Sequence, residues 1–162
     1  MFQLLPRRFP VVATGGTFDE IHVGHIALLS TAFEVGKKVI IGVSGDDFAI
    51  RRGKSLNHDF DQRVENLKKM IRKEFGQVNY VISELVSDFG PAVTSGDVEA
   101  LVTSTETQDK GNLLNKIRAK KGLKPIQIVA VELIKAEDGH PISSTRIRVG
   151  EIDSKGKLLK KR

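Results

Sequence analysis

The sequence contains no cysteine and no tryptophan, and tyrosine occurs once. Without cysteine the chain has no disulfides, no thiolate nucleophile and no cysteine-ligated zinc, so any metal has to be bound by histidine, carboxylate or substrate phosphate oxygens. The near absence of tyrosine and tryptophan also leaves few side chains for stacking on single-stranded bases. These absences disfavour a zinc module and a binder of single-stranded nucleic acid.

Long hydrophobic runs are missing as well. No apolar stretch approaches the ~20 residues of a membrane-spanning helix, and the N-terminal sequence MFQLLPRRFP lacks the pattern of a secretory signal. Hydrophobic residues make up 40% and charged residues 28% of the 162 residues, a balance typical of one soluble globular domain. We therefore expect a cytoplasmic protein without membrane contacts.

The formal charge of +6 is concentrated at the C-terminus. Five of the 26 Lys and Arg residues lie in residues 155–162, and the other 21 nearly balance the 20 Asp and Glu residues. This distribution predicts a domain over residues 1–154 and a basic tail over residues 155–162. A solvated, mobile tail is the simpler interpretation, and contact with RNA or another polyanion is the alternative.

Apolar segments alternate with segments of helical spacing along the chain. We expect strands at 9–14, 38–43, 80–82, 100–103 and 126–133, and helices at 23–35, 59–75, 90–95 and 108–121, with a last helix starting at Ser143. This alternation predicts an α/β fold with a Rossmann-like five-stranded parallel sheet and helices on both faces. Ligands of such folds bind beyond the carboxyl ends of the strands, which here are the loops after residues 14, 43, 103 and 133.

The first of these loops, residues 14–25, has the sequence TGGTFDEIHVGH. Its paired glycines allow a tight turn that approaches a ligand closely, and His22 and His25 then lie on one face of a helix start. Amide groups at a helix start attract phosphate, and Gly24 leaves them uncovered. The two imidazoles are suited to donate hydrogen bonds to a phosphate in a transition state.

Other interpretations of this loop remain open. Asp19 with the two histidines is a possible metal site, and the histidines could serve only in capping or packing. The spacing of a dinucleotide-binding turn is absent, and so is the Walker A pattern, so a P-loop ATPase is not expected.

The second motif, PISSTRIR at residues 141–148, places three hydroxyl residues at a helix start. This pattern is typical of an N-cap, and the arginines add forked donors that suit phosphate. A helix start with this composition could bind a leaving pyrophosphate.

The two motifs together resemble the nucleotidyltransferase superfamily, over about residues 9–153. Within it, the stretches AEDGHPISSTRIR at 136–148 and GEID at 150–153, with Asn115 and Arg118 upstream, resemble the archaeal-type phosphopantetheine adenylyltransferases. The resemblance implies adenylyl transfer from ATP to 4′-phosphopantetheine, giving dephospho-CoA and pyrophosphate in coenzyme A biosynthesis. It also implies Mg²⁺ bridging the ATP phosphates.

Residue roles follow from the same resemblance. It implies His25, His22, Thr17 and Lys54 as catalytic residues, with His25 stabilising the α-phosphoryl group and Thr17 and Lys54 binding the acceptor phosphate. It also implies two sets of nucleotide-binding residues: Gly15, Gly16, Phe18 and Gly24 in the first motif, and Ser143, Ser144, Thr145 and Arg146 in the second.

Two departures from the bacterial relatives affect the acceptor side. In the bacterial relatives a lysine after the second strand binds the acceptor phosphate, and the loop RRGK at 51–54 leaves open which of its basic residues does so here. The segment TSTET at 103–107 replaces an arginine-containing loop. We expect Arg118 or Lys110 to contact the pantetheine arm instead.

Three questions stay open at this stage. Another acceptor (FMN, nicotinamide mononucleotide or glycerol 3-phosphate with CTP) would use the same motifs, and an RNA-binding module is the alternative from a different class. Nucleic acid is otherwise not expected as a partner. We expect a monomer, because no exposed apolar stripe is evident.

Overall fold

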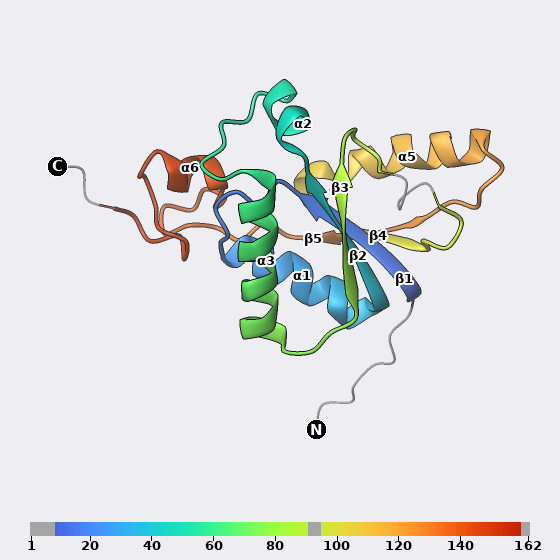
Figure 1. The fold of residues 1–162 in the computed structure, drawn as a ribbon, viewed down its shortest axis with the longest axis horizontal. Helices are drawn as coiled ribbons and strands as arrows, with labels where there is room; N and C mark the ends of the chain where they lie inside the picture. The colour runs from blue at the N-terminus through green and yellow to red at the C-terminus, as the bar shows by residue number, and fades with distance from the viewer. Residues whose placement is uncertain (1–8, 91–94, 160–162) are drawn as a thin grey trace.

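The computed structural model describes residues 9–90 and 95–159, and its centre is a five-stranded parallel sheet (Figure 1). The strands are Phe9–Gly16 (β1), Gly36–Ser44 (β2), Tyr80–Leu85 (β3), Ala100–Ser104 (β4) and Gln127–Val131 (β5). They coincide with the five apolar segments, which confirms the predicted Rossmann-like α/β fold. The order is β3-β2-β1-β4-β5, so the direction in which strands are added reverses between β1 and β4.

The helices are Val23–Val35 (α1), Asp46–Arg51 (α2), Phe60–Phe75 (α3), Asp109–Lys120 (α5) and Ser144–Arg148 (α6), with a 3-10 turn at Thr105–Thr107 (η1). All but α2 and η1 agree with the predicted helices to within one residue. The prediction of a loop between residues 43 and 59 was wrong for α2, which is too short to show a helical period. The helix predicted at 90–95 falls mostly on residues 91–94, outside the described residues.

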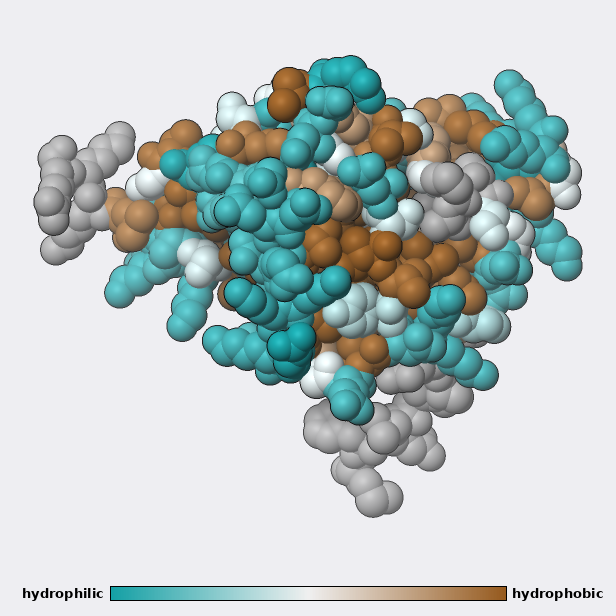
Figure 2. All heavy atoms as spheres, in the orientation of Figure 1, coloured by the Kyte–Doolittle hydropathy of each residue, from teal (hydrophilic) through white to brown (hydrophobic). Residues whose placement is uncertain are grey.

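Both faces of the sheet are covered (Figure 1). Helices α1 and α3 bury Leu29 and Leu67 against one face, while α5 buries Leu114 near Ala13 on the other. The outer surface of α3 is polar, as Figure 2 shows, because its apolar residues all turn toward the sheet. No helix of residues 9–90 or 95–159 is long and apolar enough to cross a membrane.

After β5 the chain builds a small unit of its own around α6. Isolated antiparallel bridges join Lys135 to Pro141 and Ile152 to Leu158. Three buried apolar side chains, Ala136, Ile142 and Ile152, form its core.

This unit is fastened to the start of α1 by its C-terminal segment. The amide of Val23 donates to the carbonyl oxygen of Ser154 (3.1 Å), and the amide of Glu137 donates to that of Gly156 (2.8 Å). A Cβ on Gly156 would lie 2.7 Å from Ile142, so the segment packs tightly on the unit's core. Residues 155–159 are therefore attached to the folded unit through their backbone, while Lys155 and Lys157 remain exposed to solvent.

Replacing Ile152 with alanine tests whether this unit contributes to global stability. Ile152 is fully buried, so Ile152→Ala should lower the free energy of unfolding by about 2–5 kcal/mol in urea denaturation. Ile134→Ala, at a side chain that is 39% exposed, is the matched control and should cost clearly less. Equal effects of the two substitutions would show that the C-terminal unit is not packed as described.

Candidate active site

A cavity of about 410 Å³ lies at the carboxyl ends of β1 and β4, where the strand order reverses. Its walls come from the segments that follow all five strands. The four loops predicted to bear the site therefore meet there, joined by the segment after β3, which sequence reasoning did not include. Of the twelve predicted residues ten line the cavity: Gly15, Gly16, Thr17, Phe18, His22, His25, Lys54, Ser143, Ser144 and Thr145.

Thr17 and Phe18, in the turn after β1, both line the cavity. The ring of Phe18 is otherwise buried and packs on the His25 ring at 4.9 Å between centroids. Phe18 has a φ of 55°, in the left-handed region that costs a non-glycine residue about 1–2 kcal/mol. Gly15 passes close to β2, where a Cβ would stand 3.0 Å from the carbonyl oxygen of Gly42. The buried Phe18 ring holds this strained turn in place.

The two histidines form a reciprocal cap at the start of α1. Nδ1 of His22 accepts from the amide of Gly24 (3.0 Å), and Nδ1 of His25 accepts from the amide of His22 (3.2 Å). Their rings stack with centroids 3.8 Å apart. Because each Nδ1 accepts a hydrogen bond, each neutral ring carries its proton on Nε2. The pair therefore offers two N–H donors.

Both imidazoles are neutral at physiological pH. Burial lowers the pKa of His22 to about 4. Burial, together with the charge of His22, lowers the pKa of His25 to about 3. Neutral N–H donors of this kind can stabilise a negative charge that develops on a phosphate.

The cap changes the role expected of Gly24 and of the helix amides. A Cβ on Gly24 would lie 2.8 Å from Cε1 of His22, so glycine is needed for the His22 ring to fold back over the helix start. The first amides of α1 already have partners: Val23 donates to Ser154, and Gly24 and His25 donate to His22. Gly24 does not line the cavity. In the described structure the imidazoles, rather than these amides, are the donors available to a phosphate.

Helix α6 divides its two arginines between cavity and surface. Arg146 forms ion pairs with Asp138 and with Glu151 (2.8 Å), outside the cavity. Arg148 lines the cavity and lies 2.8 Å from Asp19. Arg146, which the resemblance implies as a nucleotide-binding residue, therefore does not line the cavity, whereas Arg148 does. Helical spacing carried this signal, since Arg148 follows the pocket residue Ser144 by four positions and so shares its face.

The hydroxyls of α6 are not equally free. The Ser143 side chain caps the helix by accepting from the amide of Arg146 (3.2 Å), which leaves its own O–H able to donate. The Ser144 hydroxyl donates to the carbonyl oxygen of Glu20 (3.0 Å), which fastens α6 to the loop after β1.

Asp19 is the buried carboxylate on which the two motifs meet. It accepts from Arg148 and from the amides of Asn57 (3.0 Å) and His58 (2.9 Å). Burial raises its pKa, but the bonds from Arg148 and the two amides outweigh burial, so the pKa lies below the ordinary value of 3.8. Asp19 is thus an anion in the folded protein.

Arg63 of α3 is a buried cation that, like the anion Asp19, connects several segments through hydrogen bonds. Its fully buried guanidinium donates to the carbonyl oxygens of Thr17 (2.8 Å), Ser44 (2.7 Å) and His58 (3.1 Å), and pairs with Asp46 (2.7 Å). It fixes the ends of β1 and β2 relative to each other. No sequence motif indicated a role for Arg63.

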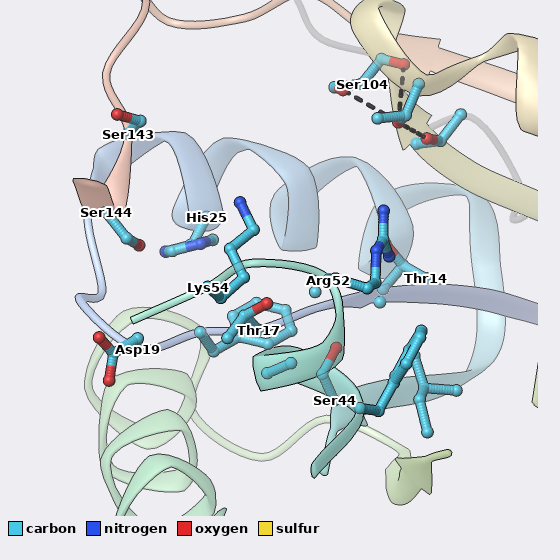
Figure 3. Close-up of a pocket in the computed structure, with 18 of the residues that line it drawn as sticks. Thr14, Thr17, Asp19, His25, Ser44, Arg52, Lys54, Ser104, Ser143 and Ser144 are labelled. Atoms are coloured by element: carbon cyan, nitrogen blue, oxygen red, sulfur yellow. Dashed lines mark hydrogen bonds between the residues drawn. The ribbon is translucent and has the colours of Figure 1, made fainter. Parts of the chain in front are cut away.

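Three cations from outside α6 line the cavity: Arg52, Lys54 and Lys110. In the 51–54 loop, Arg51 donates to the carbonyl oxygen of Val86 (3.1 Å) and does not line the cavity, while Lys54 points into it (Figure 3). Within residues 9–90 and 95–159, Lys54 has no ion pair within 4.0 Å.

Of the two residues expected to contact the pantetheine arm, only Lys110 lies at the cavity. Arg118 is buried elsewhere and donates to the carbonyl oxygens of Ser95 (2.9 Å) and Lys124 (2.9 Å), which is a structural role.

The proposed metal alternative at Asp19 and the histidines finds little support in the geometry. Each Nδ1 of the pair accepts an amide hydrogen bond, and the Asp19 oxygens are occupied by Arg148 and by amides. Asp19, Glu20 and His58 do bring three potential ligand atoms within 4.8 Å of one another, but Asp19 is the same committed carboxylate.

Comparison with known proteins identifies relatives over nearly the whole chain. A family model described as cytidylyltransferase-like matches residues 13–150. The phosphopantetheine adenylyltransferase of Methanothermobacter thermautotrophicus is 40% identical over 157 residues, covering 97% of this chain and 94% of the relative. That of Methanosarcina acetivorans is 42% identical over 151 residues, covering 92% and 96%.

Solved structures agree with the fold. A protein of unknown function from Archaeoglobus fulgidus superposes with a TM-score of 0.68 at 33% identity, over 76% of this chain and 89% of that one. A tyrosyl-tRNA synthetase from the same organism reaches a TM-score of 0.63 at 13% identity, over 86% and 60% of the two chains, a likeness of fold alone.

The protonation of the histidine pair can be measured directly. In ¹⁵N-edited NMR of the free protein, the imidazoles of His22 and His25 should remain neutral, with the proton on Nε2, from pH 8 down to pH 5, because their pKa values of about 4 and about 3 lie below that range. The exposed ring of His140, which lies outside the cavity, serves as the internal control for a solvent-accessible imidazole. Protonation of either buried ring above pH 5 would contradict the described cap.

Proposed function

Because the chain belongs to the cytidylyltransferase-like family and, within it, to the phosphopantetheine adenylyltransferases, we propose that its cavity joins ATP to 4′-phosphopantetheine. An oxygen of the acceptor phosphate attacks the α-phosphorus of ATP, the bond from that phosphorus to the bridging oxygen of the β-phosphate breaks, and pyrophosphate leaves. The products are dephospho-CoA and pyrophosphate. The observation that carries this function is that the two phosphate motifs, distant in sequence, face one cavity at the point where the strand order reverses.

The acceptor phosphate and the reacting phosphorus belong at the centre of this cavity. Thr17 offers a hydroxyl, and Lys54 offers an ammonium group that no carboxylate of the described residues neutralises. His25 and His22 supply the Nε2–H donors that stabilise charge on the α-phosphoryl oxygens as the bond to the acceptor forms. Positioning and charge stabilisation of this kind suffice for phosphoryl-type transfers, so no covalent intermediate is invoked.

The leaving pyrophosphate belongs at α6. Ser143 can donate its O–H, Thr145 lines the cavity, and Arg148 has guanidinium donors beyond those that Asp19 accepts. Ser144 supports this wall through its bond to Glu20. Arg146 contributes indirectly, since its ion pairs with Asp138 and Glu151 hold α6 in place.

Mg²⁺ fits this arrangement as an ion that arrives with the nucleotide. It prefers phosphate oxygens and water, with at most one or two carboxylates, and needs no protein cage. Asp19, the carboxylate that lines the cavity beside α6, is committed to Arg148 and two amides, so the described residues would act on the ion through the phosphates that they bind. The ion would supply charge neutralisation on the leaving oxygens.

The other acceptors share the phosphate chemistry and differ in the remainder of the molecule. FMN and nicotinamide mononucleotide carry an aromatic ring, and glycerol 3-phosphate is much shorter than phosphopantetheine. No observation favours any of them over phosphopantetheine. The RNA-binding alternative has no specific observation in its favour: Lys155 and Lys157 are exposed, but residues 155–159 are hydrogen-bonded to the C-terminal unit.

A pyrophosphate-release assay with ATP, Mg²⁺ and each acceptor in turn tests this function. Phosphopantetheine should give release, with dephospho-CoA identified by mass, and FMN and nicotinamide mononucleotide should not. Release with another acceptor alone would keep the chemistry and overturn the substrate. Silence with all of them would contradict the transferase function.

His25→Ala is the control that assigns this activity to the cavity. Loss of one preorganised donor should lower kcat on the order of 10²–10³-fold. His140→Ala removes an exposed histidine outside the cavity and should leave the rate unchanged. A normal rate for His25→Ala would refute the role of His25.

A further inference from the structure

The charged side chains of the cavity are divided between its two ends. Toward α6, Arg148 pairs with the buried Asp19. Toward α2 and α5, Arg52 lies 3.5 Å and Lys110 3.9 Å from the same oxygen of Asp88. Helices α5 and α6 lie on opposite sides of the sheet's carboxyl edge (Figure 1), so these are separate clusters.

The Asp88 cluster is a loose one. All three side chains are about half exposed, at 56% for Asp88, 43% for Arg52 and 41% for Lys110. Asp88 makes no side-chain hydrogen bond within the described residues. Half-exposed ion pairs of this kind contribute little to stability, typically about 0–1 kcal/mol. The main effect of the Asp88 carboxylate is therefore to offset part of the positive charge of Arg52 and Lys110.

The remaining walls at this end are uncharged. Leu85, Phe89 and Leu101 line it with apolar surface. Thr103, Ser104 and Thr107 line it with hydroxyls that bond to one another, in a cluster that Figure 3 shows apart from Ser143 and Ser144. Such walls suit a flexible chain with amide groups, whose carbonyl oxygens accept from hydroxyls and cations and whose methyl groups pack on apolar residues.

We propose that Asp88 is a specificity-determining residue, which offsets one of the two positive charges of Arg52 and Lys110 so that this end accepts the uncharged amide arm of the acceptor in preference to polyphosphate. The inference rests on the proposed function for the identity of the arm. Arg52 and Lys110 then act as hydrogen-bond donors to the arm rather than as a phosphate clamp. ATP is thereby confined to the α6 end of the cavity, and a second ATP molecule does not occupy the place of the pantetheine arm.

The positive charges at this end are close enough to bind a polyanion together. The pKa of Lys110 is lowered by burial and by the nearby charges of Arg52 and Lys54, and Asp88 counteracts part of that effect. Removing the Asp88 charge would leave three cations with no carboxylate among them, an arrangement suited to a triphosphate.

Calorimetric titration with inorganic tripolyphosphate tests the proposal without relying on catalysis. Asp88→Asn should bind one tripolyphosphate more per chain than the wild-type protein. The affinity of the added site should be at least about tenfold higher than that of any residual binding there in the wild type, because the Asp88 carboxylate that repels the anion has been removed. The double variant Arg52→Ala/Asp88→Asn should lose the added site. In the acceptor assay, ATP should become an inhibitor of Asp88→Asn that competes with phosphopantetheine.

Asp109→Asn is the matched control, since it removes the same charge from an exposed position next to Lys110 that does not line the cavity. It should bind tripolyphosphate as the wild type does. An unchanged number of sites and unchanged affinity in Asp88→Asn would overturn the proposal, as would an equal gain in Asp109→Asn, which would reflect net charge alone. A wild-type protein that binds no tripolyphosphate while Asp88→Asn gains one would sustain this inference and remove support for the pyrophosphate site at α6.

Discussion

The buried carboxylate of Asp19 connects the parts of the molecule on which the site depends. It lies in the turn after β1, pairs with Arg148 of α6, and accepts amides from the segment that leads into α3. Burying an unpaired anion would cost several kcal/mol, and removing one partner of a buried pair typically costs about 3–5 kcal/mol. Arg63 repeats this logic with a buried cation on three carbonyl oxygens. Asp19 and Arg148 are 129 positions apart in the sequence, so the two motifs are held in one geometry by a pair of charges that solvent screens little.

This rigidity matters because the chemistry relies on preorganised donors. In each imidazole of the His22–His25 pair, Nδ1 accepts a hydrogen bond from an amide at the helix start. The proton therefore lies on Nε2, where it can be donated to a ligand. The same bonds explain the glycine between the histidines, since any side chain there would collide with the His22 ring. Neutral donors held in this way lose no reorganisation energy when charge develops on a phosphate.

Much of this could be predicted from the sequence, because the signals were local. Apolar runs gave the five strands, paired glycines marked the turn after β1, and the hydroxyls at 143–145 marked the start of α6. Helix α2 was missed because six residues are too few to show a period. The exchange of Arg146 for Arg148 and the buried Arg63 depend on which partners the fold brings within reach, such as Asp138 and Asp19, and no local pattern encodes that.

In the proposed reaction, the two phosphates that become joined lie in one cavity, between the motif at residues 14–25 and the motif at residues 141–148. A crystal structure with dephospho-CoA and magnesium pyrophosphate tests this arrangement most directly. We expect the adenylyl phosphate within hydrogen-bond distance of Nε2 of His25, and the pyrophosphate on Ser143 and Arg148. A product phosphate bound away from His25, or a pyrophosphate on Arg52 and Lys110, would contradict it.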